Sequence, residues 1–347
     1  MHHLNQSIHL VGSVPLANSA EVFGTICDAF GPHVRRVPDG ETGIRTRWIS
    51  FQRDMLMAHP AVTLDPEGRT EPFRDLKGQV RRQNHLLVLK DGISAETISF
   101  LPLGYASAAI DSYTTFAQQQ ANGEIPPNVR FQVSLPTPFA TGLFYFHPKS
   151  QVAFIACMKA ALLAELAQIC DAIPHEKLAI QWDCCQEILL AEGYFPNDWT
   201  YDMPALFPTL GELGDAVPAD VELGYHLCYG SPMDEPLVQQ ADMQVAVDFT
   251  NGIHAALTRP LTFIHLPVSD PSADDAFFAP LAQLTIDDTT ELYLGLINPR
   301  DAAGDSRRIA AARRHRANFG IATECGWGRK NREKIPPLLA EHMAALS

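Results

Sequence analysis

Residues 221–229 read VELGYHLCY, a short β-rich run that ends in a histidine and a cysteine two positions apart. Seven further runs of this kind occur, and with Val221–His226 they make eight predicted strands: Ile8–Val11, Val34–Val37, Arg130–Leu135, Leu178–Trp182, Leu261–Leu266, Glu291–Ile297 and Gly320–Thr323. Helix-like segments such as Val152–Ile173 and Asp305–Asn318 separate most of them. Because parallel neighbours need a crossover, this alternation predicts a parallel sheet, and eight units predict its closure into a single (β/α)8 TIM barrel of the α/β class.

A doubly wound open sheet is the alternative architecture. It is weakened because no glycine-rich dinucleotide-binding fingerprint follows the first predicted strand. One segment decides which residue reaches the site: Met243–Phe249 alternates like a strand, but lies in a stretch of helical length between Pro236 and Pro260. We therefore predict a helix over Pro236–Leu257 and a sixth strand over Leu261–Leu266.

The chain has 347 residues, of which 46% are hydrophobic, which is enough to bury one large core or two modest ones. We predict a single catalytic domain over residues 1–347, with a long insertion between strands two and three, at about residues 42–128. Long loops at the carboxyl face of a barrel usually cover the substrate pocket. The insertion is therefore expected to shape the site.

The formal net charge of −14 argues against a nucleic acid partner and against binding to an anionic membrane. No apolar window of about 18 residues and no signal peptide is expected. The seven cysteines are odd in number and scattered, which does not suggest a disulfide framework. A cytoplasmic protein with small-molecule substrates fits best, and its oligomeric state stays open.

Polar residues gather where the predicted strands end, which is where a barrel enzyme places its catalytic groups. In chain order these positions hold Gly12-Ser13, Asp39-Gly40-Glu41, Pro136-Thr137-Pro138, Asp183, His226-Leu227-Cys228, His265, Asn298 and Glu324-Cys325-Gly326. On a strand, side chains two positions apart point the same way, so His226 and Cys228 can reach one ion. Cys325, at the end of the last strand, can converge on it.

One imidazole and two thiolates fit zinc better than magnesium or calcium, which prefer oxygen ligands. Taken alone, the His-x-Cys spacing favours a buried polar histidine and an inert core cysteine. The shared position of His226, Cys228 and Cys325 at strand ends favours a catalytic Zn²⁺ site with one coordination position open for substrate.

At this point the chain resembles the catalytic half of cobalamin-independent methionine synthase, in the superfamily that also holds uroporphyrinogen decarboxylase and epoxyalkane:coenzyme M transferase. The matching words span most of the chain: VGSVP at 11–15, DGETGIR at 39–45, SLPTP at 134–138, IQWD at 180–183, HLCY at 226–229, INPR at 297–300 and TECGWGR at 323–329. HLCY and ECGWGR together are the specific pair.

The resemblance implies a role for each matching residue. His226, Cys228 and Cys325 match zinc ligands of the family. Glu41 and Asp183 match carboxylates that bind the amino acid thiol substrate, Asp183 through its amino group, and Ser13 matches the loop that holds its carboxylate. From the residues alone, other roles stay open: Glu41 can pair with Arg45 or Arg47, Asp183 can cap the next helix, and Ser13 can simply form a turn. Cys184 and Cys185 are interpreted as packing residues.

The chain departs from the family at two positions. The family takes a fourth zinc ligand, a glutamate, from strand six; here the candidate is His265, with Asp248 as the rival if residues 243–249 form a strand. The family also has a histidine near strand seven that assists methyl transfer, where this chain has Asn298, a predicted substrate-binding residue. An asparagine cannot act as that acid, so the alkyl donor stays open.

The sequence therefore predicts a zinc-dependent S-methyl or S-alkyltransferase in which Zn²⁺ activates a small-molecule thiol, with homocysteine, and hence methionine biosynthesis, implied by the resemblance. A thiol of ordinary pKa is mostly protonated at neutral pH, and zinc coordination deprotonates it. Glu41 and Asp183 are the predicted catalytic carboxylates, which orient the thiol. The alternatives are an epoxide-to-thiol alkyltransferase, a uroporphyrinogen decarboxylase-like lyase and a non-catalytic thiol or metal binder.

Overall fold

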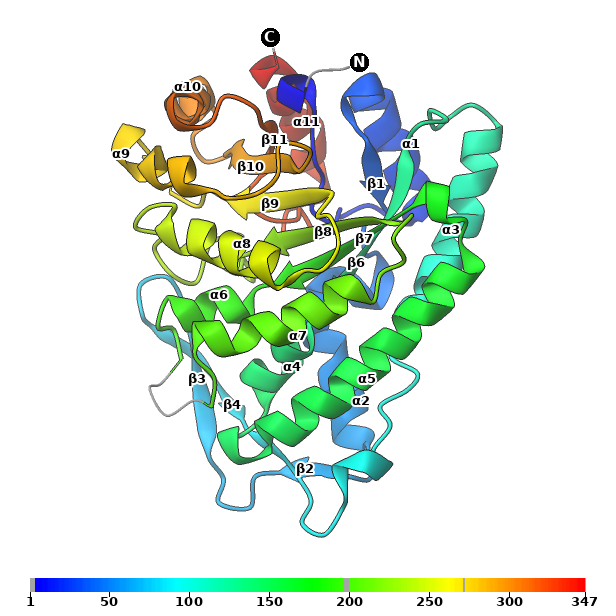
Figure 1. Cartoon of the computed structure of the whole chain (residues 1–347), viewed down its shortest axis with the longest axis vertical. Helices are drawn as coiled ribbons and strands as arrows, with labels where there is room; N and C mark the ends of the chain where they lie inside the picture. The colour runs from blue at the N-terminus through cyan, green and yellow to red at the C-terminus, as the bar shows by residue number, and fades with distance from the viewer. Residues whose placement is uncertain (1–3, 196–199, 271, 347) are drawn as a thin grey trace.

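The computed structural model describes residues 4–195, 200–270 and 272–346. Its centre is a curled sheet of seven parallel strands in the order β1, β6, β7, β8, β9, β10 and β11 (Figure 1). Their bounds are Arg36–Pro38, Arg130–Pro136, Leu178–Cys184, Glu222–Leu227, Phe263–Pro267, Glu291–Ile297 and Gly320–Thr323. Every residue of β7 is buried, as expected for a parallel sheet covered on both faces. These seven predicted strands are confirmed within a few residues.

The first predicted strand, Ile8–Val11, is wrong as a regular strand. Ile8 makes isolated parallel bridges to Val34, just before β1, and to Ile321 of β11. The carbonyls of Leu10 and Val11 accept hydrogen bonds from side chains instead of a neighbouring strand: Gln132 Nε2 donates to both, at 3.0 and 3.1 Å. The segment therefore lies between the two edge strands of the sheet without extending the ladder.

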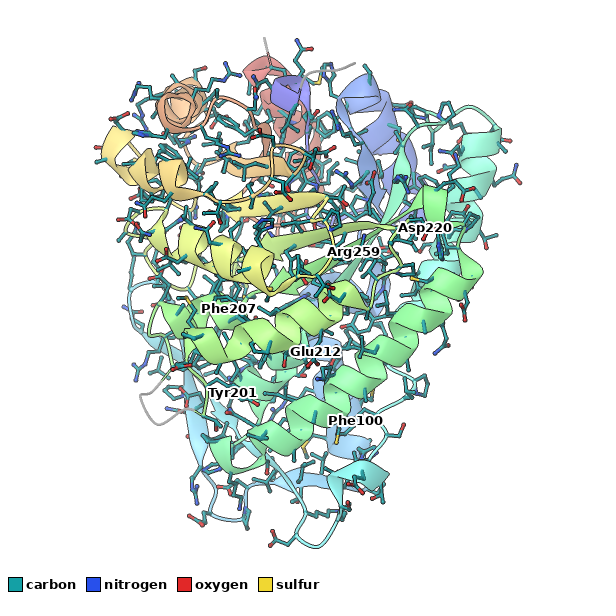
Figure 2. All side chains as sticks on the ribbon, in the orientation of Figure 1. Phe100, Tyr201, Phe207, Glu212, Asp220 and Arg259 are labelled. Atoms are coloured by element: carbon teal, nitrogen blue, oxygen red, sulfur yellow. The ribbon has the colours of Figure 1, made fainter. Side chains whose placement is uncertain are left out.

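Helices surround the sheet, and several lie in front of it in Figure 1. The longer ones are α1 Ser19–Phe30, α3 Tyr105–Ala121, α5 Pro148–Ala172, α7 Met203–Asp215, α8 Gln244–Ala256, α10 Asp305–His315 and α11 Ile335–Ala345, and the shorter ones are α2 Gln52–Ala58, α4 Pro138–Tyr145, α6 Gln186–Ala191 and α9 Asp275–Phe278. Side-chain packing holds them together. Phe207 of α7, labelled in Figure 2, packs edge-on against Phe249 of α8, with ring centroids 5.2 Å apart.

The ambiguous stretch at residues 243–249 is helical, as predicted. Helix α8 begins at Gln244, whose backbone N–H donates to Asp242 Oδ1 at 2.7 Å, so it starts later than the predicted Pro236. Its buried residues follow helical spacing: Ala246, Val247, Phe249, Thr250 and Ile253. Asp248 lies on the exposed face and accepts a hydrogen bond from Gln244. Asp248 therefore does not lie on a strand, which was the condition for it to replace His265 as the candidate fourth ligand.

Between β1 and β6 the chain builds a separate layer below the sheet in Figure 1. A short irregular helix, η3 Gly43–Phe51, leads into α2 and then into two antiparallel pairs, β2 Val62–Leu64 with β5 Leu87–Leu89 and β3 Thr70–Arg74 with β4 Val80–His85. Helix α3 returns the chain to β6. This segment brings aromatic residues, among them Trp48 and Tyr105, beside Glu41.

Helix α5 differs from the sequence-based expectation in one respect. Among the described residues it is the one helix with the length and composition of a membrane span: 25 residues, with a hydropathy of 1.8 in its most apolar window. Half of that window is buried inside the fold, where Phe154 stacks on Phe146 with centroids 3.7 Å apart. An apolar stretch of this length is thus present, although the sequence analysis expected none, and it packs as a core helix.

Candidate functional site

Three predicted ligands meet at the carboxyl end of the sheet. His226 lies in β8, Cys228 follows it directly, and Cys325 follows β11. Their potential ligand atoms all lie within 4.8 Å of one another, and the sulfurs of Cys228 and Cys325 are 3.3 Å apart. His226 and Cys228 are buried, while Cys325 is partly exposed. The two-residue repeat of a strand sets His226 and Cys228 on one side of β8, and the curl of the sheet brings the end of β11, two strands further along, to the same place.

A hydrogen-bonded chain fixes the orientation of the His226 ring. His265 of β9 contacts the carbonyl oxygen of Thr323 through Nε2 at 3.0 Å, and its Nδ1 lies 2.7 Å from His226 Nδ1. Burial lowers the pKa of His265 to about 3 and lowers that of His226 well below its usual range, so both rings are neutral. The network then assigns Nε2–H of His265 as donor to Thr323, and Nδ1–H of His226 as donor to His265.

This assignment leaves His226 Nε2 as a bare nitrogen with a lone pair. It is buried and has no hydrogen-bond partner among the described residues. A buried polar atom without a partner costs on the order of 1–3 kcal/mol unless something satisfies it. Because the two thiols lie within reach of the same atom, the arrangement fits a soft, nitrogen- and sulfur-binding cation such as Zn²⁺.

Both ring nitrogens of His265 have protein partners, His226 and Thr323. In this arrangement His265 presents no free nitrogen to the three-residue cluster, and it stands behind His226. Histidine ligands of metals almost always donate their second ring N–H to such a partner. The geometry therefore favours His265 as the group that orients His226, whereas its predicted role as a fourth ligand stays a prediction.

The two thiols are protonated in the absence of a cation. A hydrogen-bond contact with Cys185, together with burial, raises the pKa of Cys228 well above its usual range. Contact with Cys228 and burial do the same to the pKa of Cys325. A bound cation inverts this balance, because a coordinating thiol is deprotonated outright. The donor set thus fits a metal whose binding releases protons.

Cys185, interpreted from the sequence as a packing residue, contacts the cluster. Its thiol interacts with that of Cys228 and lies near Gly230, where an added Cβ would come within 3.6 Å of the Cys185 sulfur. Its position directly after β7 was a partial signal, but the contact depends on register: Cys184 pairs with Leu227 across β7 and β8, which sets Cys185 opposite Cys228. Cys184 remains a buried core residue.

Two predicted carboxylates approach the same region from β7 and from the loop after β1. Asp183, in β7, accepts a hydrogen bond from Gln181 Nε2 at 2.9 Å. Burial raises its pKa well above the usual range, and the nearby Glu41 carboxylate adds to the effect. Burial likewise raises the pKa of Glu41 to about 7, although Arg45 opposes the shift. Two acids that repel each other in a dry site invite a cationic ligand.

The alternative roles left open for these acids are not the ones observed. Arg45 forms its ion pair with Asp39, at 2.6 Å, rather than with Glu41. Helix α6 has Cys185 at its N-cap position and no side-chain cap, so Asp183 does not cap it. The Glu41 side chain instead reaches Gly12, where an added Cβ would stand 2.7 Å from Glu41 Oε1. A side chain at position 12 would therefore displace this carboxylate from its present position.

Ser13 joins the two motifs beside it. Its backbone bridges Gly40, its carbonyl accepts from the N–H of Trp327 at 2.7 Å, and its hydroxyl accepts from the N–H of Gly328 at 3.2 Å. The VGSVP, DGETGIR and TECGWGR motifs thus meet at one place. In this structure the Ser13 hydroxyl supports the loop that carries Cys325, and its substrate contact stays a prediction.

Two further acids near the site were given no predicted role, although Glu324 belongs to the strand-end group Glu324-Cys325-Gly326. Glu187 of α6 accepts a hydrogen bond from the Thr137 hydroxyl, and burial raises its pKa to about 7. Glu324, next to Cys325, pairs with Arg300 at 3.1 Å, and burial raises its pKa to about 7 although Arg300 opposes it. Residue type alone gave no signal for either, because most glutamates are exposed.

One cavity borders the cluster, and a second lies beside Glu41. The larger, of about 250 Å³, is lined by Cys325, Asn298, Arg300 and residues of the loop after β8 and of α11. The smaller, of about 10 Å³, lies beside Glu41 and is closed by Trp48, Phe51 and Tyr105. Asn298 follows β10, and its Oδ1 accepts from the backbone N–H of Arg300 at 3.0 Å. The cluster is therefore approached most openly from the Cys325 side.

No protein-family model matches this chain, and no curated protein sequence matches it. Solved structures are similar to this chain, and two of them are similar over nearly its whole length. One is a B12-independent methionine synthase from Shewanella sp. W3-18-1 in complex with selenomethionine, with 14% identity and a TM-score of 0.64 over 99% of this chain and 97% of the other. The second is a putative vitamin-B12-independent methionine synthase from Listeria monocytogenes, with 15% identity and a TM-score of 0.50 over 97% and 96%.

This chain has a methionine synthase-like fold. The resemblance inferred from seven short motifs is thereby confirmed at the level of the fold. A methionine synthase-like fold also accounts for the place of the cluster, because parallel α/β folds of this kind gather functional groups at the carboxyl ends of their strands.

Proposed function

We propose that the protein is a zinc-dependent transferase that moves an alkyl group, by default a methyl group, to a small-molecule thiol. The single observation that carries the proposal is the convergence of His226, Cys228 and Cys325 with His226 Nε2 unpartnered and buried. The methionine synthase-like fold supports the same class of reaction. The proposal includes one catalytic domain, a barrel of eight units in which the Ile8–Val11 segment, bridged at Ile8 to both sheet edges, takes the place of the eighth strand.

His226 Nε2 and the thiolates of Cys228 and Cys325 would hold the zinc ion. When bound, zinc lowers the pKa of a coordinated substrate thiol, which otherwise stays mostly protonated at neutral pH. His265 holds the His226 ring in the tautomer that presents a bare Nε2. With three protein ligands, one position remains for the substrate sulfur.

Glu41 and Asp183 would bind the head group of the thiol. Asp183 is buried and Glu41 is half-buried, and the Glu41 carboxylate adds to the burial that raises the pKa of Asp183, so a substrate ammonium between them would relieve their repulsion. This favours an amino acid thiol such as homocysteine, with methionine as the methylated product. Binding the ammonium in a fixed position orients the sulfur, so that a bimolecular step becomes effectively unimolecular.

The proposed partners are two small molecules, a thiol and an alkyl donor. With a net charge of −14, neither a nucleic acid nor an anionic membrane is proposed. All seven cysteines lie in described residues and all seven are free thiols, which supports a reducing, cytoplasmic location.

Elemental analysis tests the proposed function. The purified protein should carry close to one zinc per chain, and the double variant Cys228→Ser/Cys325→Ser should lose it. The matched control is Cys27→Ser, a buried thiol of α1 that should leave zinc content unchanged. Full zinc retention by the double variant would overturn the ligand assignment and with it the proposed chemistry.

A further inference from the structure

The proposed function assigns no ligand to the larger cavity, of about 250 Å³. It opens beside Cys325, the one member of the cluster that is not fully buried, and it lies between the ends of β10 and β11, the loop after β8, and α11. Glu41 and Asp183 do not line it. A thiol held by those two carboxylates would leave this cavity vacant next to the reacting sulfur.

The charges around this cavity balance. Three cationic residues, Arg300, Lys330 and Lys334, and three acidic residues, Asp234, Glu324 and Glu341, line it, so its formal charge is zero. Arg300 pairs with Glu324 at 3.1 Å, and Lys330 with Asp234 at 2.5 Å. In a chain with a net charge of −14, a locally neutral and highly charged cavity suits a ligand that has separate charges but no net charge.

Two buried side-chain atoms of the lining residues have no hydrogen-bond partner among the described residues, and one is a donor while the other is an acceptor. Asn298 is 4% exposed, and its Nδ2, a donor, has no hydrogen-bond partner among the described residues. Glu341 Oε2, an acceptor on a negative group, has none either. A ligand that carries an oxyanion and a positive group would satisfy both, and burying either atom without a partner is costly.

We propose that this cavity binds the alkyl donor, and that the donor is a compact zwitterion with a carboxylate at one end and an alkylated onium group, a sulfonium or a quaternary ammonium, at the other. The carboxylate faces Asn298 Nδ2 and the onium group faces Glu341. This inference rests on the proposed transferase function and names its second substrate class. The volume of about 250 Å³ lies below the roughly 300–1,000 Å³ of pockets for drug-sized ligands, which favours a compact donor.

The transfer balances without a proton. The thiolate sulfur attacks the alkyl carbon, a carbon–sulfur bond forms, and the bond from that carbon to the onium atom breaks. The electron pair stays on the onium atom, which becomes the uncharged sulfur or nitrogen of a thioether or tertiary amine, and this product leaves with its carboxylate still negative. Asn298 has no proton to give at neutral pH, and a leaving group of this type needs none. The asparagine therefore serves as a hydrogen-bond donor to the carboxylate end.

Calorimetric titration of the zinc-loaded protein tests the inference. The probes are dimethylsulfoniopropionate and trimethylglycine, which carry both charges, with tetramethylammonium and 3,3-dimethylbutanoate as matched ligands that carry one each. The zwitterions should bind at least tenfold more tightly than either single-charge ligand. Asn298→Asp, which keeps the oxygen that accepts from Arg300, and Glu341→Gln should each weaken zwitterion binding about tenfold. Lys149→Ala, exposed at the start of α5, is the control.

Homocysteine titrated into the same variants separates this inference from the proposed function. Unchanged homocysteine affinity with weakened zwitterion affinity supports a separate donor cavity. Equal binding of all four probes, or a loss confined to homocysteine, overturns the donor assignment while leaving zinc–thiol chemistry intact. Absence of zinc from the purified protein overturns the proposed function instead, and zwitterion binding to that protein then reports on the cavity by itself.

Discussion

His226 and His265 face one another through their Nδ1 atoms at 2.7 Å, on adjacent strands whose Cα positions pair in register. This contact, with the His265 bond to Thr323, decides which nitrogen of His226 is bare. The sequence places both histidines at strand ends, but only the hydrogen bonds show that one stands behind the other. The account of the metal site depends on this relationship.

Replacing His265 with glutamine should weaken zinc binding about 10- to 100-fold, the usual effect of removing the partner of a metal-bound histidine. Competition with a chromophoric chelator measures the affinity. Cobalt spectra of the variant should keep the sulfur-to-metal charge-transfer band and the tetrahedral d–d intensity, since both thiolates remain. A change of coordination number in the variant would show that His265 is itself a ligand. His85→Gln, exposed in β4, is the control.

Asp183→Asn should weaken thiol binding by about 1.5–3 kcal/mol, the typical worth of a hydrogen bond to a charged group, with zinc content unchanged. Titration with homocysteine measures it, and Asp111→Asn on the exposed face of α3 is the control. A variant that binds homocysteine normally but melts at a lower temperature would assign Asp183 a structural role only.

Glu187→Gln should change how stability depends on pH. Burial raises the Glu187 pKa to about 7 in the folded state from an ordinary 4.5, so the folded state holds a proton that the unfolded state has lost. Stability from this group is therefore present below about pH 4.5 and is lost as pH rises through 7, a difference of roughly 3 kcal/mol.

The Gln variant should thus be more stable than the parent at pH 8 and nearly equal at pH 5. Urea unfolding at both pH values measures the difference, with Glu96→Gln, an exposed glutamate, as control. Parallel stability profiles of parent and Glu187→Gln would show that the buried carboxyl does not hold a proton.

Metal removal should make Cys228 and Cys325 prone to form a disulfide, because their sulfurs lie 3.3 Å apart and no cation then holds them as thiolates. Chelation followed by diamide, which is reduced as the two thiols are oxidised, should lower the count of free thiols from seven to five. Zinc-loaded protein should resist this loss. The Cys185→Ala variant should behave like the parent, and if it does not, Cys185 is the oxidation partner of Cys228.

Hydrophobic pattern predicted β6 to β11 well, since each is a buried run bounded by turn residues and followed by a helix. It failed at Ile8–Val11 because Gln132 and Gln181, distant in sequence, supply the partners of the Leu10 and Val11 carbonyls. A local apolar run contains no information about such partners. Residues 243–249 alternate like a strand, but they were correctly predicted to be helical because the stretch that contains them has the length of a helix.

Strand-end placement was enough to predict that His226, Cys228 and Cys325 meet. It could not predict that the ring nitrogens of His265 are both engaged, because which nitrogen faces which partner depends on side-chain rotation across strands. Cys185 was missed for a related reason: its contact with Cys228 follows from the register of β7 on β8. Register is a tertiary property that residue spacing within one strand does not report.

X-ray absorption at the zinc edge tests the central claim most directly. The resting protein should show zinc with two sulfur ligands, and addition of homocysteine should raise this to three sulfurs at about 2.3 Å. Cys228→Ser should lower each number by one if it still holds the metal. A protein without zinc, or a zinc shell that keeps two sulfurs when saturated with the thiol, would contradict zinc activation of a thiol at His226, Cys228 and Cys325.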